Sequence, residues 1–306
     1  MTPSNLAELK KITRIDFSTG RGLDLTEPVV MGAINVTPDS FSDGGEAPTV
    51  EIAVERALAM IDDGAKIIDI GGESSRPGAQ EVPVDEELKR ATPVIAELRD
   101  ISDVVISVDT RKSEVAQAAI DCGADIINDI SAGLFDPKMI PLVSARRAGY
   151  LLMHMRGTPQ TMQDEPQYKD VVAQVLSFLK KQTSVCLDVG IDPKHIMIDP
   201  GIGFGKRLKD NIALMENINQ LGELGYPVVI GLSRKSFIRG LDPRAVSPGD
   251  RLGGSIASAL AAFARGAKII RVHDVRETVQ ALRVYKGIMN ASRQEENIKD
   301  VVRASA

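Results

Sequence analysis

The sequence of 306 residues has no tryptophan, only two cysteines and no long apolar run. The best candidate for a membrane span, Ile256–Ala264, contains Ser258 and falls far short of the ~18 residues that a helix needs to cross a bilayer. Residues 1–20 lack the apolar centre of a signal peptide, because Glu8 and Asp16 interrupt them. We therefore expect no membrane association and a cytoplasmic location.

Positive charge is also in short supply, since 37 Lys and Arg face 42 Asp and Glu for a net charge of −5. A broad basic surface is what nucleic-acid binding requires, so we expect no nucleic-acid partner. The two cysteines, Cys122 and Cys186, are too far apart for a paired metal motif, and we expect both to be small buried side chains in a reducing compartment. Because aromatic residues make up only 4%, the core must be aliphatic.

Short apolar runs rich in β-branched residues recur along the whole chain. Such runs, apolar on both faces, are typical of strands buried on both sides of a parallel sheet. We predict eight strands: Val29–Ile34, Lys66–Ile70, Val104–Val108, Asp125–Asn128, Tyr150–His154, His195–Asp199, Val228–Leu232 and Lys268–Val272.

Segments with helical periodicity separate these strands. One such segment runs from Val54 to Ile61, with Gly64 placed as a left-handed C-cap, and another covers Leu208–Leu224. Within the predicted helix Glu86–Leu98, Pro93 should cause a kink or a restart.

This alternation predicts an α/β fold, either a (β/α)8 TIM barrel or a doubly wound open sheet. Seven of the eight strands end in polar residues, and only a barrel gathers all its strand ends around one mouth, so we favour a single barrel. We assign residues 29–290 to the barrel, 1–28 to a segment covering its bottom, and 291–306 to a frayed polar tail.

Three polar residues at the ends of different strands would meet at the mouth of such a barrel. Asp109, Asn128 and Asp199 would suit a flat heterocycle with an N–H-rich edge, because carboxylate and amide oxygens accept those hydrogen bonds. Each Asp has the alternative role of a helix N-cap. Asn35 follows the first strand directly, so we interpret it as functional rather than as part of a solvated turn.

A cationic set follows the last two strands, where this architecture usually binds anions. It consists of Arg234, Lys235, Arg271 and His273. The glycine-rich segment Gly201–Lys206 lacks the spacing of both the P-loop and the dinucleotide fingerprint, so ATP and NAD are rejected. Of the remaining histidines, His154 stays ambiguous, and His195 begins a strand and is predicted to be structural.

Taken together and in order, these segments resemble the dihydropteroate synthase family of pterin-binding TIM barrels. The matching stretches are Met31–Gly45, Asp69–Gly78, Ser107–Thr110, Asn128–Ile130, Met153–Met155, Asp199–Lys206, Gly231–Lys235 and Arg271–Val275. Ser75 stands where the family often has Thr, and Arg156 where Gln is common.

The resemblance implies condensation of 6-hydroxymethyl-7,8-dihydropterin diphosphate with 4-aminobenzoate, assisted by Mg²⁺, in a homodimer. It implies a pterin site formed by Asp109, Asn128, Asp199, Lys235 and Arg271, and a diphosphate site formed by Asn35, Arg271 and His273. It further implies an aminobenzoate site formed by Ser75, Arg76, Pro77, Phe204 and Ser236, and mobile loops carrying Asp39, Phe41 and Arg76. Asp109, Asp199 and Lys235 would be catalytic, Asn35 would reach the metal, and the diphosphate would leave before the amine attacks.

Three alternatives remain open at this point. The first is a related barrel that holds a methyl-folate for a corrinoid partner, and the second is a catalytically silent pterin-binding subunit. The third is a phosphosugar isomerase or aldolase, in which Lys235 would form a Schiff base.

Overall fold

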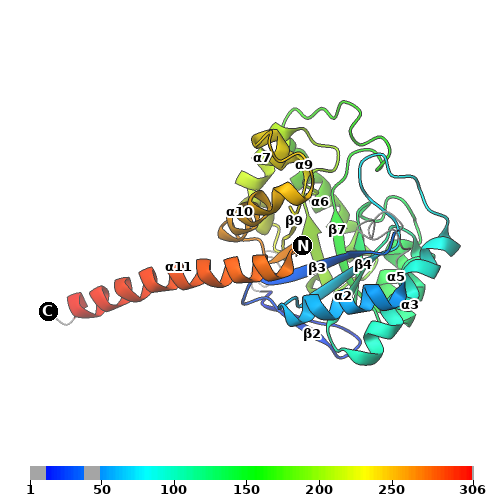
Figure 1. Ribbon diagram of the computed structural model, residues 1–306, viewed down its shortest axis with the longest axis horizontal. Helices are drawn as coiled ribbons and strands as arrows, with labels where there is room; N and C mark the ends of the chain where they lie inside the picture. Colours follow the sequence, from blue (N-terminus) through cyan, green and yellow to red (C-terminus); the bar gives the residue numbers. More distant parts are fainter. Residues whose placement is uncertain (1–11, 38–48, 305–306) are drawn as a thin grey trace.

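Eight parallel strands form the centre of the molecule. The computed structural model describes residues 12–37 and 49–304 of the chain (Figure 1). The strands are β3 (Val29–Asn35), β4 (Ile67–Gly71), β5 (Val105–Asp109), β6 (Ile126–Asp129), β7 (Gly149–Met153), β8 (Ile196–Asp199), β9 (Val229–Gly231) and β10 (Ile269–Val272). Each agrees with its predicted strand to within one residue at either end.

The sheet closes on itself. The strands pair in the order β8-β7-β6-β5-β4-β3-β10-β9, and a parallel bridge between Ile198 and Val228 joins the two outer strands. The predicted (β/α)8 barrel is confirmed, and the open doubly wound sheet is excluded.

Helices surround the barrel and pack against its outer face (Figure 1). They are α2 (Val50–Asp62), α3 (Val84–Ile101), α4 (Ser113–Asp121), α5 (Met139–Arg146), α6 (Val171–Asp188), α7 (Leu208–Glu216), α8 (Ile218–Gly222), α9 (Ser236–Leu241), α10 (Leu252–Ala264) and α11 (Val275–Ala304), with short 3-10 turns η2 (Pro193–His195) and η3 (Gly249–Arg251). Their inward faces form an aliphatic cluster with the outward faces of the strands.

Two of the predicted helices differ from or refine the prediction, and one predicted helix end is confirmed. Helix α3 runs through Pro93 without a restart. The segment predicted as one helix from Leu208 is two, because the chain leaves helical geometry at Asn217, whose amide Nδ2 donates to the Ala213 carbonyl at 2.8 Å. Gly64 has the positive φ of 109° that its predicted left-handed position requires.

Helix α11 projects beyond the barrel (Figure 1). It continues to Ala304, over most of the segment 291–306 that we expected to be a frayed tail. The difference has a local reason, because residues 291–304 contain neither glycine nor proline and are rich in residues of high helix propensity.

The lower half of the barrel interior is apolar. Side chains alternate between the two faces of a strand, so every second residue points inward. The inward cluster is Val29, Met31, Ile67, Val105, Ile126, Leu151, Met197, Val229 and Ile269. A hairpin of β1 (Arg14–Asp16) and β2 (Gly22–Asp24) adds Ile15, Phe17, Leu23 and Leu25 to the same cluster, so it closes this end of the barrel.

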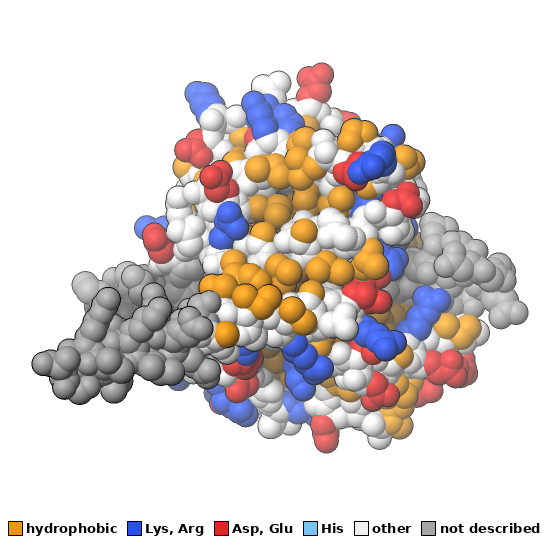
Figure 2. All heavy atoms as spheres, turned by 60° about the vertical axis from the view of Figure 1, so that its left-hand side comes forward, with side chains coloured by type: hydrophobic (Ala, Val, Ile, Leu, Met, Phe, Trp, Pro, Cys, Tyr) orange, Lys and Arg blue, Asp and Glu red, His pale blue; other side chains and the backbone are white. Residues whose placement is uncertain are grey.

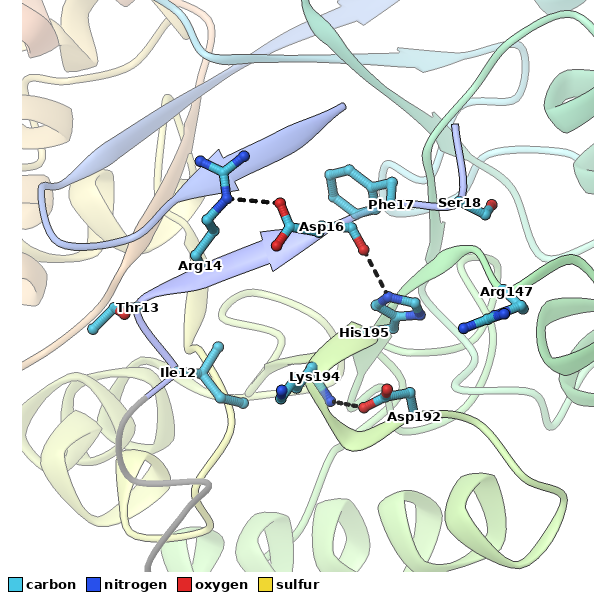
Figure 3. A pocket seen from close by; sticks show the side chains of 10 residues that line it. All are labelled: Ile12, Thr13, Arg14, Asp16, Phe17, Ser18, Arg147, Asp192, Lys194 and His195. Atoms are coloured by element: carbon cyan, nitrogen blue, oxygen red, sulfur yellow. Dashed lines mark hydrogen bonds and ion pairs between the residues drawn. The ribbon is translucent and has the colours of Figure 1, made fainter. Parts of the chain in front are cut away.

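A cavity of about 620 Å³ lies beside this hairpin, at the closed end (Figure 3). Among the charged residues that line it, Arg14 pairs with Asp16 at 2.6 Å. His195 Nε2 lies 2.9 Å from the Asp16 carbonyl and its ring stacks on Phe17, which supports the structural role predicted for this histidine.

In the ranges that the structure describes, no helix is long and apolar enough to span a membrane.

Candidate active site

On five of the eight strands, the inward positions change from apolar to polar two residues further along, near the carboxyl ends. Ile67 is followed inward by Asp69, Ile126 by Asn128, and Ile269 by Arg271. The same step leads from Val105 to Ser107 and Asp109, and from Met197 to Asp199. The barrel therefore has a polar layer at its mouth, built directly on an apolar floor.

Arg271 lies at the centre of this polar layer, between two carboxylates. Its Nε donates to Asp69 Oδ2 at 2.6 Å, and its Nη2 donates to Asp109 Oδ2 at 2.9 Å. Asn128 Nδ2 donates to the same Asp69 oxygen at 3.1 Å. Four strands thus contribute one hydrogen-bonded network, which fixes the planes of all four side chains.

The two predicted pterin carboxylates are both buried. Burial raises the pKa of Asp109 to about 7, against the opposing effect of Arg271, and Asp69 raises it further. Burial also raises the pKa of Asp199, whereas Lys235 and the Gly201 N–H, which donates to Asp199 Oδ1 at 2.6 Å, oppose that shift. Near neutral pH, hydrogen-bond donors from a ligand would favour the ionised form of Asp109.

Asp69 and Ser107 are polar-layer residues that the sequence reasoning did not assign to the site. They are register partners on β4 and β5, and both are fully buried. Among the described residues, Asp69 Oδ1 and Ser107 Oγ have no hydrogen-bond partner. The sequence signal for Asp69 is an acid inside an apolar run, Ile67-Ile68-Asp69-Ile70, and a rule that considers only the residues after each strand misses it.

Lys235, at the N-cap of α9, lies close enough to Asp199 of the polar layer to affect its pKa. Its ammonium donates to the Ile202 carbonyl and lies 4.7 Å from the centre of the Phe204 ring, a cation–π contact. Burial lowers its pKa to about 8, with Asp199 opposing this change. Gly231 leaves space here, because even a methyl group at that position would lie 3.6 Å from the ammonium.

The glycine-rich segment 201–206 forms a shelf that carries Phe204. Gly201, Gly203 and Gly205 all have positive φ, and a Cβ on Gly201 would lie 2.0 Å from the His154 carbonyl oxygen. The glycines therefore permit a tight backbone contact rather than a nucleotide loop.

The side chain of Lys206, the last residue of this segment, stabilises the shelf by hydrogen bonds. Its buried ammonium donates to the carbonyls of His154, Gly201 and Phe204 at 3.1, 2.8 and 2.9 Å. It also lies 3.0 Å from His154 Nδ1. Burial, together with Lys206, lowers the pKa of His154 to about 3, so this histidine is a neutral structural partner of the lysine.

His273 does not belong to a cationic set, contrary to our expectation. Burial, together with Arg271 and Arg234, lowers its pKa to about 4, so the ring is neutral near pH 7. Ser233 Oγ accepts the His273 backbone N–H at 3.2 Å and lies 3.1 Å from Nδ1. A serine hydroxyl donating to Nδ1 leaves the proton on Nε2, which can then donate to an anion.

Arg234 is engaged at the rim of the barrel. Its guanidinium forms a bidentate ion pair with Asp274, in which Nε lies 3.1 Å from Oδ2. The backbone of Arg234 has a positive φ of 60°, stabilised by Ser255 Oγ, which accepts the Arg234 N–H at 2.8 Å.

The remaining predicted residues surround the mouth. Asn35 ends β3, half-buried, with its Oδ1 3.7 Å from where a Cβ on Gly71 would lie. In the loop after β4, Ser75 is half-buried whereas Arg76 and Pro77 are exposed, and Arg76 lies close enough to His273 to lower its pKa. Ser236 is the exposed first residue of α9, and Asp39 and Phe41 lie outside the described residues.

Arg156, which stands where the family commonly has Gln, belongs to the loop that follows β7. Its guanidinium donates to the Gln167 carbonyl and lies 5.2 Å from the centre of the Tyr168 ring. The Tyr168 hydroxyl in turn donates to the Gly205 carbonyl at 2.8 Å, so this loop contacts the shelf.

Known proteins are similar to this chain over most of its length. Residues 31–273 match the family described as pterin binding enzyme. The dihydropteroate synthase of Escherichia coli K12 is 46% identical over 275 residues, which cover 90% of this chain and 96% of that protein.

Two solved structures have the same architecture. Dihydropteroate synthase from Xanthomonas albilineans with 4-aminobenzoic acid is 48% identical, with a TM-score of 0.85 over 90% of this chain and 98% of that one. The Xanthomonas albilineans dihydropteroate synthase in complex with 7,8-dihydropteroate is 45% identical, with a TM-score of 0.82 and the same coverage. The chain therefore belongs to the dihydropteroate synthase family of pterin-binding transferases.

Proposed function

We propose that this chain condenses 6-hydroxymethyl-7,8-dihydropterin diphosphate with 4-aminobenzoate to give 7,8-dihydropteroate and pyrophosphate, a step of folate biosynthesis. The observation that carries this proposal is the polar layer, in which Arg271 is held between Asp69 and Asp109 on an apolar floor. A flat pterin ring has donors and acceptors around its edge, and this layer presents oxygens and a guanidinium in fixed planes. A Schiff-base aldolase does not account for that arrangement. The corrinoid-linked barrel also holds a pterin, and it is disfavoured instead by the family to which the chain belongs.

The charges of the layer suit ionisation of the pterin methylene. When its C–O bond breaks, positive charge develops on the pterin and negative charge on the diphosphate. Asp109 and Asp199, both buried, favour the cation, whereas His273 would donate a hydrogen bond from Nε2 to the diphosphate. Arg271 is held by two carboxylates, so its orienting role in the pterin site is better supported than a second role at the diphosphate.

We also propose that departure of the diphosphate precedes attack by the amine. The aromatic amine is neutral near pH 7, so attack needs no dedicated general base. Single-turnover experiments without 4-aminobenzoate should then show cleavage of the pterin diphosphate. If cleavage depended wholly on added 4-aminobenzoate, the order of steps would be wrong although the overall reaction could still hold.

Mg²⁺ is proposed as the metal that assists departure, with Asn35 as its protein ligand. Mg²⁺ keeps several waters and is usually bound by one or two protein oxygens together with substrate phosphates. Among the described residues, no group of three or more His, Cys, Asp or Glu side chains could hold a metal. A single amide oxygen at the end of β3 fits an ion that is held mainly by the diphosphate, where it would neutralise charge on the leaving group.

The aminobenzoate site is proposed to lie between Phe204 on the shelf and Ser75 and Pro77 on the loop after β4. Phe204 offers an aromatic face beside the Lys235 ammonium, and that ammonium would attract the aminobenzoate carboxylate. Ser236, in the first turn of α9, would supply a hydroxyl and backbone N–H groups to the same carboxylate.

Pyrophosphate release with and without 4-aminobenzoate tests the proposed reaction. Turnover should require both substrates and should be lost in Arg271→Ala, because Asp69 and Asp109 then lose the cation between them. Arg14→Ala is the matched control, since Arg14 is partly exposed at the closed end of the barrel (Figure 3). Pterin binding without turnover in the unaltered protein would instead favour a silent pterin-binding subunit.

We further propose a homodimer that forms through α10 and α11. Hydrophobic side chains gather on the face that carries these helices (Figure 2), and exposed apolar residues of this region include Leu252, Val284, Ile288 and Met289. An exposed apolar surface of this kind is typical of an interface. Sedimentation of the purified chain should give twice its mass of 32.9 kDa, and Ile288→Glu should shift it to the monomer.

A cytoplasmic location is proposed on the state of the two thiols. Cys122 and Cys186 are both free, as expected of a protein kept in a reducing compartment. Cys186 is buried as predicted, whereas Cys122 is only partly buried. Fractionation of cells that produce the chain tests this location directly.

A further inference from the structure

The loop after β4, residues 74–81, leaves the barrel and returns to α3, and its tip contacts the other side of the mouth. The Gly78 N–H donates to the Pro159 carbonyl at 2.9 Å, and Gln160 Nε2 donates to Gln80 Oε1 at 3.3 Å. Pro159 and Gln160 belong to the loop that follows β7. The 74–81 loop therefore reaches the loop after β7, and its Ser75 is half-buried.

The two ends of this loop meet at a single ammonium group. Glu73 precedes the loop and Val82 follows it, and the Val82 N–H donates to Glu73 Oε2 at 3.0 Å. Lys112 Nζ donates to that same Glu73 oxygen and also to the Val82 carbonyl at 2.6 Å. Its third contact is Glu87 Oε2 on α3, at 2.6 Å. All three ammonium protons therefore have acceptors, and two of these acceptors are the ends of the loop.

The contacts of Lys112 with Glu73, Val82 and Glu87 form a buried clamp at the base of the loop. The side chains of Lys112, Glu87 and Glu73 are only 6%, 1% and 10% exposed. Arg111 donates to the other Glu73 oxygen at 2.9 Å, is held against the Phe135 ring and lies 3.5 Å from the more exposed Glu81 carboxylate of the loop, so two cations face two buried carboxylates and one at the surface. Burial opposes ionisation of Glu73, but Lys112 and the Val82 N–H outweigh it and lower the pKa of this carboxyl.

Lys112 lies close in the sequence to a residue of the pterin site. Asp109 ends β5, and Lys112 stands three residues later at the N-cap of α4. The base of the loop is also packed closely, because a Cβ on Gly72 would lie 2.9 Å from the Glu87 carbonyl oxygen. The position of the 74–81 loop is therefore set by the same short segment that places the pterin carboxylate.

We propose that Lys112 is a positioning residue of this enzyme, which holds both ends of the 74–81 loop together so that Ser75 and Pro77 meet 4-aminobenzoate. This inference rests on the proposed aminobenzoate site. Lys112 does not itself touch a substrate, and pterin binding in the barrel interior does not depend on it.

Lys112→Met, Lys112→Arg and the control Lys89→Met test the proposal. Lys89 is an exposed lysine on α3 with only a surface ion pair to Asp85. Hydrogen exchange of the peptide covering residues 74–82 reports on the clamp without any substrate. The KM values for 4-aminobenzoate and for the pterin diphosphate, measured separately, report on function.

In Lys112→Met, exchange of residues 74–82 should become faster, and the KM for 4-aminobenzoate should rise about tenfold to a hundredfold. The affinity for the pterin alone should stay within about twofold, Lys112→Arg should recover part of the loss, and Lys89→Met should change nothing. If Lys112→Met fails to fold, Glu73→Gln, which keeps the shape and loses the charge that Lys112 holds, should give the same pattern.

Unchanged exchange in a folded Lys112→Met protein would overturn the clamp. Equal losses of pterin and aminobenzoate binding would also overturn the proposal, because they would indicate general destabilisation of the barrel. Faster exchange with an unchanged KM for 4-aminobenzoate would refute the role of the loop at that site, although the reaction itself would still stand if turnover persists.

Discussion

Pterin binding should weaken as the pH falls from 7.5 towards 5.5. The reason is Asp109, whose pKa burial raises to about 7 in the protein without ligand. A pterin N–H needs an ionised acceptor, so binding at low pH requires Asp109 to release a proton. Affinity therefore rises with pH through the pKa of the free enzyme, which is the sign expected when the ligand prefers the deprotonated form.

The size of the effect follows from that pKa. One pH unit below it, roughly 90% of Asp109 carries a proton, so the affinity should be about tenfold lower, equivalent to ~1.4 kcal/mol. Asp199, whose pKa burial also raises, acts in the same direction. Above pH 8 the affinity should fall again, because burial lowers the pKa of Lys235 to about 8. His273 contributes nothing in this range, since its pKa is lowered to about 4.

Isothermal titration of 6-hydroxymethylpterin, which lacks the ionisable diphosphate, measures this dependence. Titrations at pH 6 in two buffers of different ionisation enthalpy should show release of close to one proton on binding. Asp109→Asn should bind weakly and lose most of the pH dependence, with a smaller slope left by Asp199, and Asp192→Asn, at the closed end of the barrel, should behave as the unaltered protein. An affinity that stays constant from pH 5.5 to 7.5, or a slope that is undiminished in Asp109→Asn, would refute the reasoning.

Three further variants probe the supports of the site. Lys206→Met should lower the free energy of unfolding in urea by about 2 to 4 kcal/mol, because it removes the buried ammonium that donates to three carbonyls, whereas the exposed Lys209→Met should have no effect. Gly201→Ala should destabilise by about 1 to 3 kcal/mol and raise the KM for the pterin diphosphate, since its Cβ would lie 2.0 Å from a carbonyl oxygen at positive φ. Ser107→Ala should raise the free energy of unfolding by up to about 1 kcal/mol and weaken pterin binding, because it removes an unpaired buried hydroxyl. Urea unfolding measures the stability changes, pterin titration measures the binding change, and steady-state kinetics measure the KM.

The barrel could be predicted closely from the sequence because its strands are buried on both faces. Such strands appear as brief continuous apolar runs, and the polar residues after them mark the mouth. Asp109, Asn128 and Asp199 were placed together on this basis, and the structure gives all three inward positions in the polar layer. This reasoning needs only the period of a strand and the direction of its carboxyl end.

Other features depend on contacts between distant segments and could not be predicted locally. The neutrality of His273 follows from its burial beside Arg271 and Arg234, and a sequence shows only that all three can carry charge. The clamp at Lys112 joins β4, α3 and α4, whose side chains meet only once the barrel has closed. Asn217 divides a helix through its own side chain, although the apolar periodicity continues past it.

The division of the barrel interior into two layers links stability to function. Each inward side chain of the apolar floor contributes about 1.5 to 3 kcal/mol on burial, which is similar to the cost of about 1 to 3 kcal/mol for one unpaired buried polar atom. Burial of the apolar floor therefore offsets the free-energy cost of leaving the Asp69 and Ser107 oxygens unpaired. A barrel with apolar residues in both layers would be more stable, but it would have no fixed acceptors for a pterin. The polar layer is best explained as a stability cost that ligand binding recovers, since a bound pterin can satisfy groups that the protein leaves unpaired.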